Sequence, residues 1–346
     1  MTYTPADDRY AARTDHWFRR CGNSGLVLPA ISLGCWHNFG DAGTDPRSLP
    51  EADFHHNAQQ MLFTAFDRGI THFDLANNYG PAPGTAETRV GQILKHDFAG
   101  YRDELMISSK AGYRMWPGPY GEWGSRKSLL ASLDQSLQRL QLDYVDIFYH
   151  HRPDPTPGGT PLEESLGALD AAVRAGKALY VGISNYSPQR TREALQVCKD
   201  HGFAKPIIHQ PSYSMLNRNI EHGLLDATGD LGLGVIPFSP LAQGLLTNKY
   251  LSVIPDDSRA KADSQFLSED RITPELQAKL RSLNTIAEAR GQSLSQLALR
   301  WALRDTRVTS ALIGASRPDQ IAQCCDALHG PDLSPEELNQ IEDILS

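Results

Sequence analysis

Short apolar runs recur along the chain, and longer segments with helical spacing separate them. Eight such runs occupy residues 31–35, 71–75, 105–109, 144–149, 178–183, 207–210, 234–238 and 310–313. Within each run the apolar character is mostly continuous rather than strictly alternating. Continuous apolar runs are typical of strands that are buried on both faces of a parallel sheet. The pattern therefore predicts eight buried strands.

The segments between these runs have the periodicity of amphipathic helices. They predict helices at residues 57–68, 87–96, 125–140, 161–175, 188–199, 220–231, 274–290, 295–303 and 334–345. Proline stands at or near a predicted helix start at positions 161, 188, 274, 318 and 335, where it is tolerated best. Strands and helices alternate eight times without a linker. This predicts an α/β fold, one (β/α)8 TIM barrel that forms a single domain over residues 1–346.

Two segments lie outside the strand–helix alternation. Residues 17–20 and 26–28 flank the turn-forming sequence Cys21-Gly22-Asn23-Ser24-Gly25, which predicts an N-terminal β-hairpin. Residues 241–274 form a long segment of mixed polarity after the seventh strand. Loops of that length in a compact domain are usually functional, and this loop would cover the C-terminal face, where barrel active sites lie.

Composition and charge narrow the function classes. The chain has 346 residues, of which 40% are hydrophobic and 21% charged, and its net charge is −8. The negative charge argues against nucleic acid or an anionic membrane as the main partner. No secretory signal or membrane-length apolar run is found, and five cysteines without CxxC spacing suit a reducing compartment. We therefore expect a cytoplasmic protein; a redox role for Cys324-Cys325 is the less favoured alternative to burial.

A carboxylate and a phenol follow the second predicted strand, at Asp74 and Tyr79. Tyrosine is a weak acid, so a proton-donating role needs a nearby cation. The third strand run is followed by Lys110, and the fourth by His150 and His151. In a closed barrel these strand ends would be neighbours. We expect Asp74 to pair with Lys110, Lys110 to lower the pKa of Tyr79, and a histidine to orient a carbonyl.

Each of these residues alone has an ordinary structural explanation, as a cap, a loop aromatic or a solvated cation. Because side chains alternate along a strand, His150 and His151 should point apart, and we assign His151 to the site and His150 to packing. The histidine pairs 55–56 and 150–151 are wrongly spaced for zinc, so no metal site is predicted. Trp36 follows the first strand and would line the pocket. Arg114 and Trp116 could reach a substrate phosphate, although a solvated arginine is an equally good interpretation.

The combined pattern resembles the aldo-keto reductase superfamily. The matching motifs are Phe73-Asp74-x4-Tyr79, Lys110, the second histidine of His150-His151-Arg152-Pro153-Asp154, and Gly182-Ile183-Ser184-Asn185. Three further stretches are similar to the bacterial L-glyceraldehyde 3-phosphate reductases, which are relatives of the potassium-channel beta subunits; they are Trp36-His37-Asn38-Phe39-Gly40, residues 115–121 and residues 129–134.

The resemblance implies NADPH-dependent reduction of a small aldehyde or ketone, with the catalytic tetrad Asp74, Tyr79, Lys110 and His151. Hydride would come from the nicotinamide and the proton from Tyr79. Trp36, Tyr79, His151, Arg114 and Trp116 would contact the substrate. The implied cofactor contacts are Trp36, Asp74, Ser184, Asn185, Gln210, Tyr213 (stacked on the ring), Ser239, Pro240, Leu241, Gln243, Lys249, Arg259, Gly314, Ser316, Arg317 and Gln320.

One departure concerns the adenine. The channel-related proteins have Glu-Asn where this chain has Gln323-Cys324, which affects the adenine contact and the choice between NADP and NAD but not the chemistry. No G-x-G-x-x-G motif is present, so a doubly wound dinucleotide domain is not indicated.

Three functions follow from these patterns. The leading one is a reductase of small aldehydes such as L-glyceraldehyde 3-phosphate or methylglyoxal. The second is a redox-sensing regulatory subunit that binds a partner protein, and the third is a metal-dependent barrel hydrolase or isomerase. Some of the channel-related proteins have asparagine at the position of His151, whereas this chain has histidine, which favours the enzyme over the regulatory subunit. The resemblance also implies a homo-oligomer, a tetramer or larger.

Overall fold

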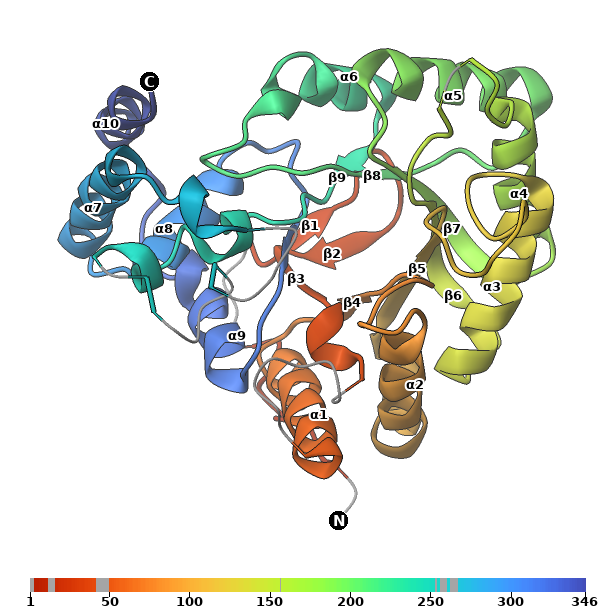
Figure 1. Cartoon of the computed structure of the whole chain (residues 1–346), viewed down its shortest axis with the longest axis horizontal. Coiled ribbons are helices and arrows are strands. Elements are labelled where there is room, and N and C mark those ends of the chain that lie inside the picture. Colours follow the sequence, from red (N-terminus) through yellow and green to blue (C-terminus); the bar gives the residue numbers. More distant parts are fainter. Residues whose placement is uncertain are drawn as a thin grey trace.

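A parallel eight-stranded sheet lies at the centre of the protein, with helices packed outside it (Figure 1). The computed structural model describes residues 3–11, 16–41, 50–155, 157–252, 254–255, 260–261 and 267–346. The strands follow the order β10-β3-β4-β5-β6-β7-β8-β9. Their bounds are β3 Ile31–Gly34, β4 His72–Asp74, β5 Met106–Ala111, β6 Val145–His150, β7 Ala178–Ser184, β8 Ile208–Gln210, β9 Gly234–Val235 and β10 Ala311–Ile313.

Backbone hydrogen bonds join the two edges of this sheet. The amides of Thr309 and Leu312 donate to the carbonyl oxygens of Val235 and Pro237, at 2.8 and 2.9 Å. The sheet with its helices is therefore consistent with the expected (β/α)8 barrel. The seventh strand was expected over residues 234–238, but β9 ends at Val235. Pro237 lacks an amide hydrogen, which interrupts the ladder there.

The helices are α1 Glu51–Asp67, α2 Thr85–Asp97, α3 Arg126–Leu140, α4 Leu162–Arg174, α5 Pro188–His201, α6 Leu224–Leu231, α7 Pro274–Ala289, α8 Leu294–Ala302, α9 Pro318–Cys325 and α10 Pro335–Leu345. Most of the helix boundaries lie within two residues of the predicted ones. Helix α1 starts earlier than expected, directly after Pro50. Helix α6 starts later, because Gly223 adopts a left-handed φ of 93° that separates it from a short 3-10 turn.

The predicted N-terminal hairpin is confirmed as β1 Phe18–Arg20 paired antiparallel with β2 Val27–Pro29. Its turn packs against the loop that enters β9: a Cβ added at Gly22 would lie 2.3 Å from the carbonyl oxygen of Gly232. Buried hairpin residues belong to the same apolar cluster as strand residues such as Ile147 and Ile208. The hairpin therefore closes the end of the sheet where strands begin, and leaves the opposite end for the site.

The loop after β9 contains 3-10 helices in its described parts, at Ala242–Gly244, Asn248–Tyr250 and Glu269–Arg271. Nothing among the described helices combines the length and the apolar character needed to cross a membrane.

Candidate functional site

Adjacent strand ends bring the predicted acid, cation and imidazole together. Asp74 is the last residue of β4 and pairs in register with Ser108 of β5. Lys110 lies two residues further along β5, and His151 directly follows β6. Because the strands are parallel, their carboxyl ends meet at one rim, as the sequence pattern required.

The Asp74–Lys110 pair is fully buried. The Lys110 ammonium donates to Oδ2 of Asp74 and, at 2.7 Å, to the carbonyl oxygen of Leu75. The other carboxylate oxygen accepts from Ser108 Oγ at 2.6 Å and from Gln210 Nε2 at 3.2 Å. Burial lowers the pKa of Lys110, and the Asp74 charge opposes that shift. The expected ion pair is thus present, and both carboxylate oxygens of Asp74 accept hydrogen bonds.

Tyr79 lies in the loop after β4, with its ring near both Lys110 and His151. The ammonium is 5.0 Å from the ring centroid, and the His151 ring centroid is 5.8 Å away in an edge-on arrangement. Trp36 contacts the same ring at 6.1 Å. Burial raises the pKa of Tyr79 well above its usual value, and Asp74 adds to the shift. The net shift is therefore opposite to the expected lowering, because burial of the phenol is its largest cause.

The two adjacent histidines have separate environments. The Nδ1 atom of His151 is buried and has no hydrogen-bond partner among the described residues. Burial and the nearby Lys110 charge lower the pKa of His151 well below its usual value, so its imidazole is neutral. Nδ1 of His150 instead hydrogen-bonds the Tyr186 hydroxyl at 2.7 Å, and Asp154 lies 3.7 Å from its Nε2. This agrees with the assignment of His150 to packing.

Amide and hydroxyl groups at the ends of β7 and β8 lie beside the Asp74–Lys110 pair. Ser184 Oγ donates to the carbonyl oxygen of Gln210 at 2.7 Å. Asn185 has a left-handed φ of 61°, and its Nδ2 donates to the His151 carbonyl oxygen at 3.0 Å and to Ser184 Oγ at 3.1 Å. The side chain of Gln210 reaches Asp74, so these three predicted cofactor residues are contiguous with the acid and cation.

The loop after β9 contains strained backbone where the pyrophosphate contacts were predicted. Ser239, Ala242 and Gln243 have φ of 56°, 48° and 60°. Non-glycine residues in this region cost on the order of 1–3 kcal/mol each and concentrate at ligand clamps. Gln243 Nε2 donates to Ser239 Oγ at 2.9 Å. Pro240 is buried, Leu241 is half-buried and Lys249 is exposed. The predicted contact Arg259 lies outside the described residues.

The predicted adenosine contacts occupy the turn from β10 into α9. Gly314 is exposed, with open space where a Cβ would be. The Ser316 amide donates to Gln320 Oε1 at 2.8 Å. Arg317 is the N-cap residue of α9, and its largely exposed guanidinium lies 3.2 Å from an Asp319 carboxylate oxygen. The first free amides of a helix of this kind favour anions.

The adenine end also contains the departure Gln323-Cys324. Gln323 is exposed, whereas Cys324 is buried, and burial raises the pKa of its thiol to about 12. A thiol with so little thiolate is a poor redox centre. Cys325 is also buried. The structural alternative for this cysteine pair is therefore favoured over a redox role.

Tyr213, the residue expected to stack on the cofactor ring, lies among other protein side chains. The side chain is fully buried, and its hydroxyl donates to Glu221 at 2.6 Å and accepts from Arg304 at 2.8 Å. Its ring packs on Trp301, with centroids 5.2 Å apart. Phe238, by contrast, lies just beyond β9 and is half-buried against the barrel-interior cluster. In the sequence it directly precedes Ser239, the first residue of the strained loop.

The predicted substrate residues are spread over two rim segments. Trp36 is half-buried against Tyr79. Arg114 is exposed and Trp116 half-buried, on the segment after β5. A residue that sequence reasoning missed is Tyr113, whose ring meets the His151 ring edge-on at 4.6 Å. Arg152 stacks on the Tyr113 ring at 4.1 Å and holds this segment near the site.

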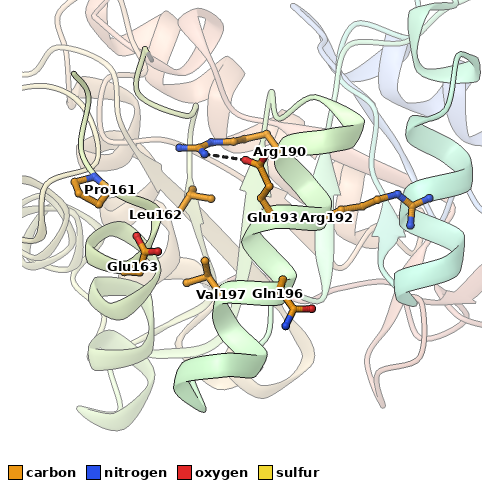
Figure 2. Close-up of a pocket in the computed structure, with 8 residues that line it drawn as sticks. All are labelled: Pro161, Leu162, Glu163, Arg190, Arg192, Glu193, Gln196 and Val197. Atoms are coloured by element: carbon orange, nitrogen blue, oxygen red, sulfur yellow. Dashed lines mark hydrogen bonds and ion pairs between the residues drawn. The ribbon is translucent and has the colours of Figure 1, made fainter. Parts of the chain in front are cut away.

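Two other features carry no chemistry of this kind. Within the described part of the chain, no group of three or more His, Cys, Asp or Glu side chains is arranged to hold a metal ion. A surface groove between α4 and α5 is lined by residues such as Leu162, Arg190 and Val197 (Figure 2). Arg190 is bound there by Glu193 at 2.9 Å, and none of the predicted site residues lines the groove.

Comparisons with known proteins found a matching family model and similar proteins. The model of the aldo/keto reductase family matches residues 30–346. An L-glyceraldehyde 3-phosphate reductase of Escherichia coli O157:H7 is 54% identical over 334 residues, which are 94% of this chain and 91% of that protein. The protein of that name from strain K12 is also 54% identical. A putative voltage-gated potassium channel subunit beta of Schizosaccharomyces pombe is 36% identical, over 95% of this chain and 93% of its own.

Proposed function

The chain belongs to the aldo/keto reductase family, and we propose on that ground that it reduces small aldehydes or ketones to alcohols with NADPH, on a (β/α)8 barrel. Members of this family are oxidoreductases that generally use NAD(P)H. The observation that carries the proposal is the grouping of a protonated phenol, Tyr79, with a neutral imidazole, His151, beside the buried Asp74–Lys110 pair.

Tyr79 is the proton donor in this proposal. Its phenol is protonated at neutral pH, so the form that can give a proton to a carbonyl oxygen is populated, but burial raises its pKa and makes it a weaker acid, so the transfer needs a nearby cation. Neutral His151 supplies a hydrogen-bonding ring next to Tyr79 and orients the carbonyl. The Lys110 ammonium lies 5.0 Å from the Tyr79 ring and stabilises the phenolate that proton transfer leaves. Positioned acids of this kind contribute about 10²–10⁴-fold to a rate.

The residues around the tetrad fit a nicotinamide cofactor. Gln210, Ser184 and Asn185 form a connected amide and hydroxyl cluster that could hold a carboxamide. The buried, unpartnered Nδ1 of His151 is a polar atom for which a ligand group or water would relieve a cost of about 1–3 kcal/mol. When bound, NADPH supplies the hydride. Half-buried Phe238, rather than buried Tyr213, offers the ring face against which a nicotinamide could stack.

NADPH rather than NADH is proposed because of the turn into α9. Arg317 is exposed at that helix N-terminus, and a guanidinium is well suited to a phosphate. Ser316 and Gln320 add hydrogen-bonding groups beside it. The strained backbone of Ser239 and Gln243 supports a role for the preceding loop at the pyrophosphate, with Pro240, Leu241 and Lys249.

The substrate is proposed to be a small aldehyde, with L-glyceraldehyde 3-phosphate and methylglyoxal as candidates. Support comes from the two relatives of 54% identity that are named L-glyceraldehyde 3-phosphate reductase. Exposed Arg114, on the segment after β5, is available to bind a substrate phosphate, and Trp116 and Trp36 would provide pocket walls. A panel of phosphorylated and unphosphorylated aldehydes, followed by NADPH oxidation, tests this choice directly.

The catalytic assignment is tested by Tyr79→Phe. We expect turnover of methylglyoxal to fall by at least about 10²-fold while NADPH binding, followed by fluorescence, stays within a small factor of wild type. Tyr149→Phe is the matched control, because that phenol also lies near Lys110, at 5.5 Å, but is fully buried and out of reach of a substrate. Unchanged reduction by Tyr79→Phe would refute the assignment.

The 36% identity to a channel-subunit protein keeps a second function in view, a redox-sensing subunit that binds another protein. The complete tetrad, including His151, favours the enzyme. Isolation of a stoichiometric partner, together with negligible turnover of every aldehyde, would reverse this order. We also propose a cytoplasmic homo-oligomer, whose size mass photometry of the purified protein would measure.

A further inference from the structure

A line of buried hydroxyl and imidazole groups runs through the sheet interior and ends on Asp74. Ser310 Oγ lies 2.6 Å from Ser32 Oγ, which lies 3.0 Å from Nδ1 of His72. Nε2 of His72 lies 3.0 Å from Ser108 Oγ, and Ser108 Oγ donates to Asp74 Oδ1 at 2.6 Å. All five side chains are fully buried. They come from the segment entering β10 and from β3, β4 and β5.

The donor and the acceptor in each hydrogen bond of this line follow from the Asp74 carboxylate at its end. An ionised carboxylate only accepts, so the single hydroxyl hydrogen of Ser108 is directed at Asp74. Ser108 Oγ must then accept from His72, which places a proton on Nε2. Burial lowers the pKa of His72 to about 4, so the ring is neutral at pH 7 and its Nδ1 is an acceptor. Ser32 therefore donates to His72, and Ser310 donates to Ser32.

We propose that His72 is a positioning residue of the reductase site, which holds the Ser108 hydroxyl toward Asp74 and thereby fixes the carboxylate that places Lys110 beside Tyr79. His72 makes no hydrogen bond to Tyr79 or Lys110, and it acts only through the carboxylate. This inference rests on the proposed function. It assigns a role to a buried titratable group that the proton-transfer step itself does not use.

The composition of the interior supports a specific role for these groups. Elsewhere the barrel interior is filled by apolar side chains such as Ile147, Ile208 and Leu312. A polar line in such surroundings is costly unless each member is satisfied, and a satisfied network specifies one arrangement. Here the network has one polarity, and its last donor meets the carboxylate at the rim. Sub-ångström placement matters there, because a 1 Å displacement can cost about 10²-fold in rate.

Adjacent serines on β5 provide a matched pair of variants. Ser108 and Ser109 are both fully buried, and each donates to a buried carboxylate at 2.6 Å: Ser108 to Asp74, and Ser109 to Glu87 outside the site. We expect Ser108→Ala to lower kcat by about tenfold or more with the NADPH Kd unchanged, whereas Ser109→Ala destabilises the fold similarly without that loss. Equal effects of both variants on kcat would overturn the proposal.

Two amide substitutions at position 72 distinguish the role of Nε2 from that of Nδ1. In His72→Gln the amide nitrogen can replace Nε2 as the donor to Ser108, whereas in His72→Asn the shorter amide lies on the Nδ1 side and cannot. We expect kcat of His72→Gln to lie within about threefold of wild type, and kcat of His72→Asn to be about tenfold lower at equal NADPH Kd. The same loss in both variants would overturn the positioning role and leave a packing role only.

A third measurement does not depend on turnover. Long-range 1H–15N spectra of histidine-labelled protein, with His72 assigned by its absence in His72→Gln, report which ring nitrogen carries the proton. We expect a protonated Nε2 and a bare Nδ1 from pH 5.5 to 8. A proton on Nδ1 would overturn the polarity even in an active enzyme. Absence of aldehyde reduction by the wild-type protein would instead overturn the proposed function, while this spectrum still tests the hydrogen-bond line.

Discussion

Replacing Lys110 by methionine removes the ammonium from a fully buried ion pair and leaves the Asp74 carboxylate behind. In the native protein that carboxylate is bound by Lys110, by Ser108 at 2.6 Å and by Gln210 at 3.2 Å. The two remaining partners are neutral donors, so they cannot balance the charge. The variant also frees the carbonyl oxygen of Leu75, which accepts from Lys110 at 2.7 Å.

The size of the effect follows from the burial of both groups. Removing one partner of a buried ion pair costs about 3–5 kcal/mol, because an uncompensated charge remains in the interior. Both side chains of this pair are fully buried, so solvent screening does not reduce the figure. The double variant Asp74→Asn with Lys110→Met contains neither charge. We expect it to recover more than half of the loss, so that the double variant is destabilised much less than the sum of the two single variants.

The assay is equilibrium urea unfolding of wild type, both single variants and the double variant, with kcat measured on the same preparations. Arg139→Met is the control, since Arg139 is bound to buried Glu87 at 2.7 Å, and the hydrogen bonds of the Glu87 carboxylate are with Ser109 and Arg139 rather than with the tetrad. It should lower stability and leave kcat close to wild type. Lys110→Met should lower kcat by about 10²-fold or more. A double variant that loses as much stability as the two single variants together would refute the reasoning, because the two charges would then act independently.

Three further predictions concern pH and the cofactor. Burial lowers the pKa of His72 and His209 to about 4. Their contribution to stability, about 3 kcal/mol for each, is therefore present above pH 6.5 and is lost as the pH falls toward 4. The free energy of urea unfolding should decrease between pH 7.5 and 4.5, and His209→Gln should reduce that decrease. Arg317→Ala should weaken NADPH binding about tenfold and leave NADH binding unchanged, as measured by fluorescence titration; equal losses would place the guanidinium away from the 2′-phosphate. Phe238→Leu should raise the NADPH Kd by about two- to tenfold through loss of aromatic stacking, and an unchanged Kd would remove this ring from the site.

Much of the architecture could be predicted from residue patterns because it depends on burial. Continuous apolar runs marked the strands, and prolines and cap residues marked most helix starts. The exceptions have local causes that spacing does not reveal. Pro237 ended β9 early, and the left-handed φ of Gly223 delayed α6. Neither residue interrupts the hydrophobic pattern, so the pattern extended each element too far.

The grouping of Asp74, Lys110 and His151 followed from strand order, since parallel strand ends meet at one rim. The electrostatics did not follow from that order. Proximity of Lys110 to Tyr79 suggested a lowered phenol pKa, yet burial raises it. Desolvation depends on the full three-dimensional surroundings of a group, which a list of strand ends does not contain. The surroundings of Tyr213 were hidden in the same way, since strand order does not show that Glu221 and Arg304 bind its hydroxyl.

The tetrad divides into a part held by the sheet and a part held by a loop. Asp74 and Lys110 are fixed by strand pairing and by donors from β5 and β8, so their geometry is as rigid as the barrel. Tyr79 belongs to the segment after β4, where its backbone amide donates a hydrogen bond to the Ala76 carbonyl oxygen at 3.0 Å. The high pKa of Tyr79 favours the protonated form, so this arrangement stores a donor rather than a base. In the proposed reduction, proton transfer from so weak an acid depends on a group that stabilises the phenolate, and Lys110, whose ammonium lies 5.0 Å from the ring centroid, is the cation placed to do so.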